Sequence, residues 1–192
     1  MLRVIGGRFR GRRLLSVPGE STRPPLSRVR AAVANILADY VDGARVLDLF
    51  TGTGSYSIEL LSRGASFATM IDIDGRAVDI AKKNVDSLGI ADRVRVIRGD
   101  AISVARSLES VDHPYRIILV APPYFSGLDL RAMEALRTSR LVDLSGIVVL
   151  QQHKKEAFSE SYGSLRLKRT YLYGETRIST YLPSIDRPPV RA

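Results

Sequence analysis

The chain has 192 residues, with 29 Lys and Arg against 20 Asp and Glu, so its formal net charge is +9 and its pI is near 10.2. This length suits one α/β domain with a short appendage and excludes a second large domain. The lack of cysteine excludes disulfides and cysteine-based metal sites, and no apolar run approaches the ~20 residues of a membrane span. We expect a soluble cytoplasmic protein with a polyanionic partner.

The basic charge is concentrated at the two ends of the chain. Residues 1–30 hold eight arginines against one acid, and residues 151–192 hold eight basic against four acidic side chains. Such clustering around a near-neutral middle indicates an electrostatic footprint for a polyanion. The alternative, a solvated basic face without a partner, stays open.

Residues 1–26 predict a basic arm. Two short apolar stretches on either side of a glycine and arginine centre indicate a small β-hairpin within residues 1–19, and Thr22-Arg-Pro-Pro-Leu-Ser27 indicates a turn. We expect Ser27 to cap a helix that runs to about Tyr40.

From residue 44 onward, strand and helix patterns alternate, and several strands are continuous apolar runs, typical of a parallel sheet covered on both faces. The predicted strands are 45–50, 66–72, 93–98, 116–121 and 146–151, and the predicted helices are 55–63, 75–88, 100–110 and 128–141. Two β-rich stretches, 165–172 and 177–182, follow with no helix between them and predict an antiparallel pair at the sheet edge.

The predicted fold class is therefore α/β, with a doubly wound, mostly parallel seven-stranded sheet of Rossmann-like type. It carries an antiparallel edge strand and the small N-terminal hairpin arm. We divide the chain into an arm of residues 1–26, a main domain of residues 27–183 and a flexible tail of residues 184–192.

The first predicted strand ends in a glycine-rich loop. Asp48 is followed by Gly52 and Gly54, which supply flexible backbone where the chain turns from strand to helix and a ligand approaches closely. A dinucleotide fingerprint needs a third Gly or Ala where this chain has Ser57. An acid before the glycines suits a cationic, amino-acid-bearing ligand better than a pyrophosphate. S-adenosylmethionine fits both observations, and a ligand-free turn is the alternative.

Two more acids end the next two predicted strands. Asp72 is placed to accept hydrogen bonds from ribose hydroxyls, and Asp100 is available for an adenine amine. Each carboxylate alone is more often a helix cap, a role that we expect for Asp74 and that stays open for Asp100. Three acids at three successive strand ends favour a ligand site at the carboxyl edge of the sheet.

The fourth strand of the alternating series ends in Ala121-Pro122-Pro123-Tyr124. The two prolines remove two backbone donors and fix the chain direction. This stiff turn directs carbonyl oxygens into the site and offers Tyr124, or Phe125, as a stacking face for a base taken out of its helix. Simple core packing of the aromatic ring is the alternative.

The sequence resembles class I N-methyltransferases with an Asp/Asn-Pro-Pro-Tyr/Phe motif, and most closely the RsmD family, which methylates the exocyclic N2 of a guanine in 16S ribosomal RNA. The resemblance covers nearly the whole chain and lies in residues 3–14, 22–30, 47–54 and 59–65 and in the Pro-Pro-Tyr turn. It implies a class I methyltransferase fold for residues 27–183, S-adenosyl-L-methionine as the cofactor, and ribosomal RNA or the small ribosomal subunit as the partner.

The resemblance also implies site residues. The cofactor would contact Asp48, Phe50, Thr51, Gly52, Gly54, Asp72, Asp100 and Ala101, and the target base would meet Ala121, Pro122, Pro123 and Tyr124. The RNA contacts would be Arg8, Arg10, Arg12, Arg13, Arg23, Arg28 and Arg30. No metal is expected, because His113 and His153 are too few and too far apart in the sequence. We expect a monomer.

Ala121 departs from the family, which normally has Asp or Asn there to accept a hydrogen bond from the target amine. By analogy with one lost oxyanion-hole partner, the rate would fall on the order of 10²–10³ without a change of fold. Three interpretations stay open: an active enzyme with another acceptor, a weakened or inactive relative that still binds RNA, or an introduced substitution.

The leading hypothesis is an S-adenosylmethionine-dependent methyltransferase of guanine N2 in small-subunit ribosomal RNA. The alternatives are an adenine N6-methyltransferase of DNA or RNA and a non-catalytic RNA-binding or ribosome-assembly factor.

Overall fold

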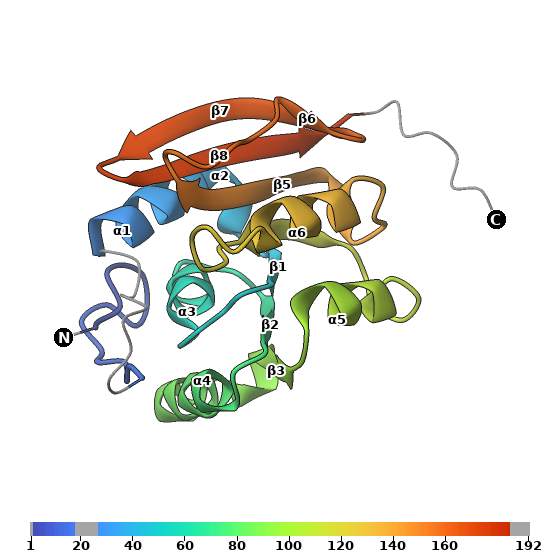
Figure 1. Ribbon diagram of the computed structural model, residues 1–192. Helices are drawn as coiled ribbons and strands as arrows, with labels where there is room; N and C mark the ends of the chain where they lie inside the picture. The colour runs from blue at the N-terminus through green and yellow to red at the C-terminus, as the bar shows by residue number, and fades with distance from the viewer. Residues whose placement is uncertain (1, 18–26, 185–192) are drawn as a thin grey trace.

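One mixed sheet of eight strands organises the protein (Figure 1). The computed structural model describes residues 2–17 and 27–184. The strands are β1 (Arg45–Asp48), β2 (Phe67–Asp72), β3 (Val94–Arg98), β4 (Tyr115–Val120), β5 (Val142–His153), β6 (Ser161–Tyr162), β7 (Leu165–Tyr173) and β8 (Thr176–Pro183). Their order across the sheet is β3-β2-β1-β4-β5-β8-β7-β6.

The first five strands in this order are parallel, and β8, β7 and β6 follow as antiparallel neighbours. The strand order reverses between β1 and β4, which is the doubly wound arrangement that the sequence predicts and confirms the fold class. The predicted strand count was too low by one, because β6 has only two residues and shows no pattern in the sequence. The antiparallel part is accordingly larger than one edge strand.

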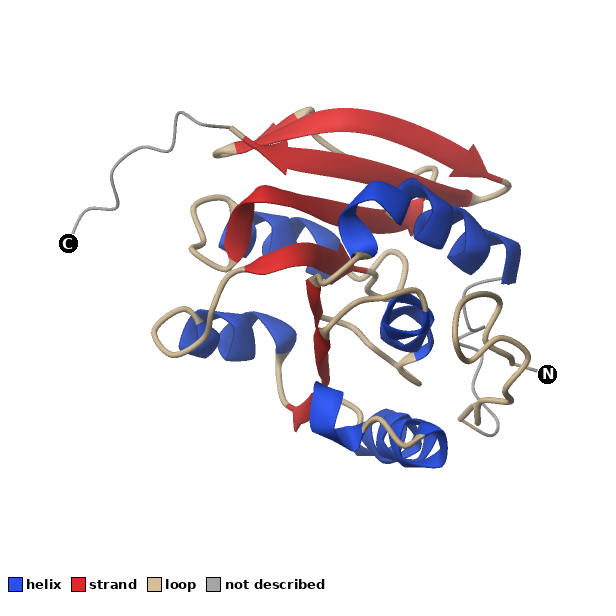
Figure 2. Ribbon diagram, turned by 180° about the vertical axis from the view of Figure 1, so that it is seen from behind, coloured by secondary structure: helices blue, strands red, loops and turns tan. Residues whose placement is uncertain are grey.

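Helices cover both faces of the sheet (Figure 2). They are α1 (Ser27–Ile36), α2 (Ala38–Val41), α3 (Ser55–Ser62), α4 (Gly75–Leu88), α5 (Ala101–Leu108) and α6 (Leu128–Leu136), with a short 3₁₀ turn η1 (Ala91–Arg93). The helix expected from Ser27 to Tyr40 is interrupted at Leu37, whose side chain is fully buried. Among the described residues, no helix is long and apolar enough to cross a membrane.

Two apolar layers fill the space between the helices and the sheet. One layer joins α1, α3 and α4 to the sheet, and the other joins α5 and α6 to its opposite face. The central strands are buried on both faces, so Ile117, Ile118 and Val120 on β4 are all inaccessible to solvent. This is the physical reason for the unbroken apolar runs in the sequence.

The N-terminal arm forms a hairpin-like loop against α3. A single antiparallel bridge joins Arg3 to Arg13, and within residues 2–17 no regular strand forms. Gly7 has a φ of 72°, and a Cβ atom there would lie 1.9 Å from the Ser62 carbonyl oxygen. Glycine is required because the arm touches the end of α3 at this point. The predicted turn of residues 22–27 and the predicted tail of residues 184–192 lie outside the described residues, except for Ser27 and Ser184.

Glu59 on α3 fastens the arm to the domain. Its buried carboxylate accepts hydrogen bonds from the backbone N–H groups of Ile5 and Gly6, both at 2.8 Å, and from Arg63 Nε at 2.9 Å. The Arg30 guanidinium lies 3.8 Å away and is also buried. One buried charge therefore holds together the arm, α1 and α3.

We predict that Glu59→Ala lowers the free energy of unfolding by about 3–5 kcal/mol, because it leaves the buried Arg30 charge without its counter-ion. Urea denaturation measures this loss. The control is Glu134→Ala, which removes an exposed partner of Arg137 and should change stability by less than about 1 kcal/mol. Equal effects of the two substitutions would contradict the anchoring role.

Candidate active site

The three acids predicted to meet at the carboxyl edge of the sheet do so. Asp48, Asp72 and Asp100 lie at or just beyond the ends of β1, β2 and β3, which are parallel neighbours. The Gly99 amide donates to the Asp72 carbonyl at 2.9 Å and links the second and third strand ends. The spatial cluster is the arrangement in which open α/β sheets bind ligands.

Asp48 is a fully buried carboxylate. Its Oδ2 accepts hydrogen bonds from Thr51 Oγ1 at 3.0 Å and Ser57 Oγ at 2.7 Å, whereas Oδ1 is buried without a hydrogen-bond partner among the described residues. Burial raises the pKa of Asp48 to about 6, and the hydrogen bonds from Ser57 and Thr51 offset part of this effect. The unpartnered oxygen fits a cationic ligand group, which would supply the missing counter-charge.

The glycine loop wraps around this carboxylate. Gly52 and Gly54 both have positive φ angles, 53° and 79°. A Cβ atom on Gly52 would meet no other atom within 4 Å, while one on Gly54 would lie 3.2 Å from Met70 Sδ. Gly54 therefore serves tight packing, whereas Gly52 lies beside open space that a ligand can enter. Of the neighbouring predicted cofactor residues, Thr51 is buried and Phe50 is half-buried against the α5–α6 layer.

Asp72 shapes the same loop from the second strand. Its Oδ2 accepts from the Gly52 amide at 2.7 Å, and its Oδ1 accepts from the Asp74 amide at 3.0 Å. Next to it, Ile73 exposes 69% of its surface. This exposed apolar side chain was not predicted from the sequence, although its position between two acids after a strand was a usable signal.

Asp100 is a helix cap, the role left open by the sequence. Its Oδ1 accepts from the Ser103 amide and the Ser103 hydroxyl, each at 2.9 Å, and these bonds hold the pKa of Asp100 below its usual value. Both bonds use the same oxygen, so a ligand role for the other oxygen stays a prediction. Ala101 is the buried first residue of α5. Asp74 caps α4 through the Arg76 amide at 2.9 Å, as expected.

Beyond β4, the proline turn presents two aromatic rings. Pro122 is buried and Pro123 is exposed, and the Tyr124 hydroxyl lies 2.8 Å from Thr176 Oγ1. Tyr124 and Phe125 expose 37% and 66% of their surfaces, which excludes simple core packing. Both rings contact His153, with centroid separations of 5.6 and 4.8 Å. His153 therefore supports the aromatic pair from β5.

The backbone of Phe125 has a φ of 58°, the one positive value at a non-glycine residue in the described ranges. Glu156 holds it there: Oε1 accepts from the Phe125 amide and Oε2 accepts from the His153 amide, both at 2.6 Å. Strained backbone of this kind occurs at functional sites. Glu156 and Thr176 were missed by sequence reasoning, because only the folded sheet brings residues so far along the chain to the turn.

The predicted RNA-contacting arginines divide into two groups. Exposed side chains belong to Arg8, Arg10, Arg12, Arg13 and Arg28. Arg23 lies outside the described residues. Arg30 was predicted as an RNA contact, but the structure buries it to 1% exposure, and its guanidinium donates to the Arg3 carbonyl. Its charge therefore serves the packing of α1 against the arm, which corrects the prediction.

Asn84 on α4 links the arm to the glycine loop. Its side chain pairs with both backbone groups of Leu15, accepting at 2.7 Å and donating at 3.1 Å, and also donates to the Thr53 carbonyl at 2.9 Å. Nothing in the sequence distinguished this asparagine from a surface polar residue. The arm and the glycine loop are consequently joined by one buried side chain.

A doubly wound sheet with an acidic carboxyl edge, a glycine loop and a proline turn defines a class I S-adenosylmethionine-dependent methyltransferase. Residues 2–182 match the model of a family described as "Conserved hypothetical protein 95". The chain belongs to this family, that of RsmD.

Several relatives show the extent of the likeness. "Putative rRNA methyltransferase YlbH" of Bacillus subtilis is 31% identical over 180 residues, which cover 94% of this chain and 98% of that protein. "Ribosomal RNA small subunit methyltransferase D" of Escherichia coli K12 is 37% identical over 127 residues, covering 66% of this chain and 62% of the relative. A solved structure, described as "Putative methyltransferase yhhF from Escherichia coli", covers 95% of this chain and is itself 98% covered, with a TM-score of 0.83 and 28% identity.

We predict that Asp48→Asn removes the part of the pH dependence of folding stability that comes from ionisation of Asp48. The raised pKa means that Asp48 contributes stability below its ordinary pKa near 4, and that this contribution is lost as the pH rises through about 6. Relative to wild type, the free energy of unfolding of the variant should rise by about 2 kcal/mol between pH 4 and pH 7. Urea unfolding across this range without ligand measures the difference, and parallel profiles would contradict the buried charge.

Proposed function

We propose that the protein methylates the exocyclic N2 of a guanine in small-subunit ribosomal RNA, using S-adenosyl-L-methionine. The observation that carries the proposal is the exposed Tyr124 and Phe125 pair on the proline turn, which follows β4 next to β1 and its Asp48. The names of the relatives from B. subtilis and E. coli support ribosomal RNA as the substrate. The basic arm supports it independently, because it reaches the glycine loop through Asn84.

The site residues fit the methyl donor. When bound, S-adenosylmethionine supplies an electrophilic methyl group on a sulfonium centre. The Asp48 carboxylate would face its ammonium group, which accounts for the buried and unpartnered Oδ1. Asp72 retains acceptor capacity for ribose hydroxyls, since each carboxylate oxygen has two lone pairs. Asp100 would take the adenine amine, and Ile73 would pack against the adenine ring.

The target base would stack on the aromatic pair after leaving its helix. The carbonyl oxygens of the proline turn would then accept hydrogen bonds from its amine and hold the nitrogen toward the methyl group. A guanine amine is conjugated with its ring and weakly nucleophilic, so orientation contributes more than a strong base. The amine nitrogen would bond to the methyl carbon while the carbon–sulfur bond breaks and leaves its electron pair on sulfur, and the surplus proton of the amine would leave to water at the open side of the site.

The direct test is incubation with labelled S-adenosylmethionine and either undermethylated small subunits or naked ribosomal RNA, followed by nucleoside analysis. Label in N2-methylguanosine is the expected result. Label in N6-methyladenosine would move the protein to the adenine class that uses the same type of turn. No incorporation at high enzyme concentration would refute the activity.

Ala121 favours a second candidate function, a non-catalytic RNA-binding factor, because it removes one polar side chain from the turn. Separate calorimetric titrations of S-adenosylmethionine and RNA distinguish the two functions. Binding of both ligands supports the enzyme, whereas RNA binding without cofactor binding supports the non-catalytic factor.

We predict that changing Arg10, Arg12 and Arg13 to Glu weakens RNA binding and flattens its dependence on salt. Each lost phosphate contact lowers the magnitude of the log–log slope by about 0.7–0.9. Fluorescence titrations at several salt concentrations measure the slope, and calorimetry should show unchanged cofactor affinity. The same charge change at Arg106, Arg137 and Arg140, around α5 and α6, serves as the control. An unaltered slope in the arm variant would exclude the arm as the contact surface.

A further inference from the structure

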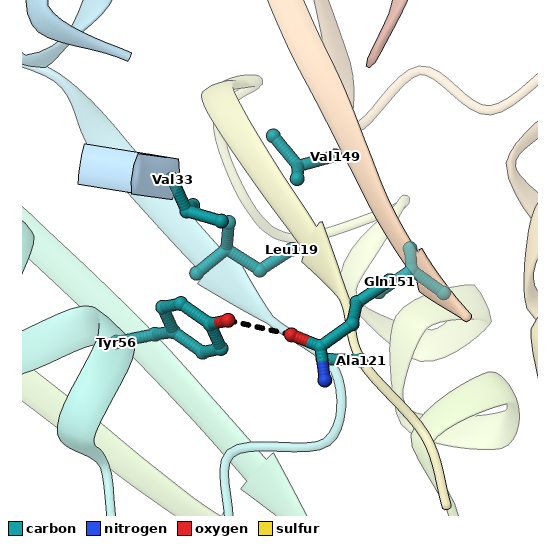
Figure 3. A pocket seen from close by; sticks show the side chains of 7 residues that line it. Val33, Tyr56, Leu119, Ala121, Val149 and Gln151 are labelled. Atoms are coloured by element: carbon teal, nitrogen blue, oxygen red, sulfur yellow. Dashed lines mark hydrogen bonds between the residues drawn. The ribbon is translucent and has the colours of Figure 1, made fainter. Parts of the chain in front are cut away.

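A small cavity of about 10 Å³ lies beside Ala121, at the end of β4 (Figure 3). This is room for roughly one water molecule or one polar hydrogen-bonding group. Its accessible walls are apolar, and its lining residues include Tyr56 from α3 and Gln151 from β5, whose polar atoms bond to each other. Ala121, where the turn lacks a polar side chain, therefore lies next to two polar residues, Tyr56 and Gln151.

Tyr56 and Gln151 form a hydrogen bond with a defined direction. The Tyr56 hydroxyl donates to Gln151 Oε1 at 2.5 Å, since an amide oxygen can only accept. Val120 pairs with Leu150 in the parallel register of β4 and β5, so Ala121 and Gln151 follow side by side. Figure 3 shows the Gln151 side chain passing beside Ala121 to reach the phenol.

Because of this hydrogen bond to Gln151, the Tyr56 hydroxyl can act toward other groups only as an acceptor. A hydroxyl has one proton and two lone pairs, and the proton of Tyr56 is committed to Gln151. No other hydrogen bond among the described residues uses the lone pairs of this oxygen. Burial raises the pKa of Tyr56 far above its ordinary value, and nearby Tyr124 and Asp48 add to this effect. The group is a neutral acceptor and not a base.

We propose that Tyr56 Oη accepts a hydrogen bond from the target amine in place of the side chain that Ala121 lacks, and that Gln151 is the positioning residue that orients the phenol. This inference rests on the proposed function. It assigns the missing acceptor to α3, the helix that also holds Asp48 through Ser57.

The methyl transfer balances without ionising Tyr56. The amine nitrogen forms a bond to the methyl carbon, the carbon–sulfur bond breaks, and its electron pair stays on sulfur. The surplus proton on nitrogen goes to water at the exposed side of Tyr124. Tyr56 keeps its own proton on Gln151 throughout and acts only on the orientation of the amine.

Tyr56→Phe tests the inference, because it removes the hydroxyl and keeps the ring. We expect kcat to fall by about 100-fold, the lower end of the loss from removing one preorganised hydrogen-bonding partner, with little change in KM. Adding Ala121→Asn to this variant should restore at least about tenfold of the rate, since the asparagine side chain places an acceptor on the turn itself. Gln151→Leu should lower kcat less than Tyr56→Phe does.

A binding measurement separates substrate contact from structural support. The RNA carries either guanine or inosine at the nucleotide that wild-type protein methylates, and inosine lacks the N2 amine. With S-adenosylhomocysteine present, wild type should bind the guanine RNA about 3–10-fold more tightly, and Tyr56→Phe should lose this preference. Calorimetry of S-adenosylmethionine binding should be unchanged.

The matched control is Tyr115→Phe. Its buried hydroxyl bonds to Thr69 and Asp112 at the other end of β4, so the same atom is lost far from the turn. This variant should lose stability but keep kcat and the guanine preference.

The outcomes distinguish this inference from the proposed function. Wild-type protein that transfers no methyl group to guanine refutes the proposed function, and the inference falls with it. Active wild type with an equally active Tyr56→Phe variant overturns the inference alone. A slower Tyr56→Phe variant that keeps the guanine preference also overturns it, because the phenol then only supports the site.

Discussion

The site depends on the hydrogen bonds that hold the buried Asp48 carboxylate. A charge without water requires fixed donors, and Thr51 and Ser57 supply them from the glycine loop and from α3. The strand end, the loop and the first turn of the helix are thereby held in one arrangement. Oδ1 remains without a partner among the described residues, so the fold keeps a buried acceptor at the carboxyl edge.

Helix α3 connects the Asp48 site to two other parts of the molecule. Tyr56 reaches from it to Gln151 beside the proline turn, and Glu59 reaches to the backbone of the N-terminal arm. Asn84 makes a second connection, from α4 to the arm and the loop. The arm is therefore built onto the same helix as the site, and buried polar contacts together with the buried side chains of Val4, Phe9 and Leu14 set its position.

The proline turn is held in place by residues from other parts of the fold. Its aromatic pair is exposed, while Glu156 from the connection after β5 holds the backbone and Thr176 from β8 contacts the tyrosine hydroxyl. The antiparallel part of the sheet therefore also contributes to the site, because Thr176 on β8 contacts Tyr124. A polar group missing at Ala121 can then be supplied by a neighbouring element without any change in the path of β4.

The sequence by itself determined the doubly wound sheet, the acids at three strand ends and the stiffness of the turn, because period, glycine and proline act locally on the backbone. It erred on Arg30, since a guanidinium looks the same in sequence whether it lies on a surface or is buried beside Glu59. It missed the two-residue β6 for the same lack of local signal. Only the tertiary structure decided which side chains meet Ala121, because Tyr56 and Gln151 lie 95 residues apart and become neighbours when α3 packs onto the sheet.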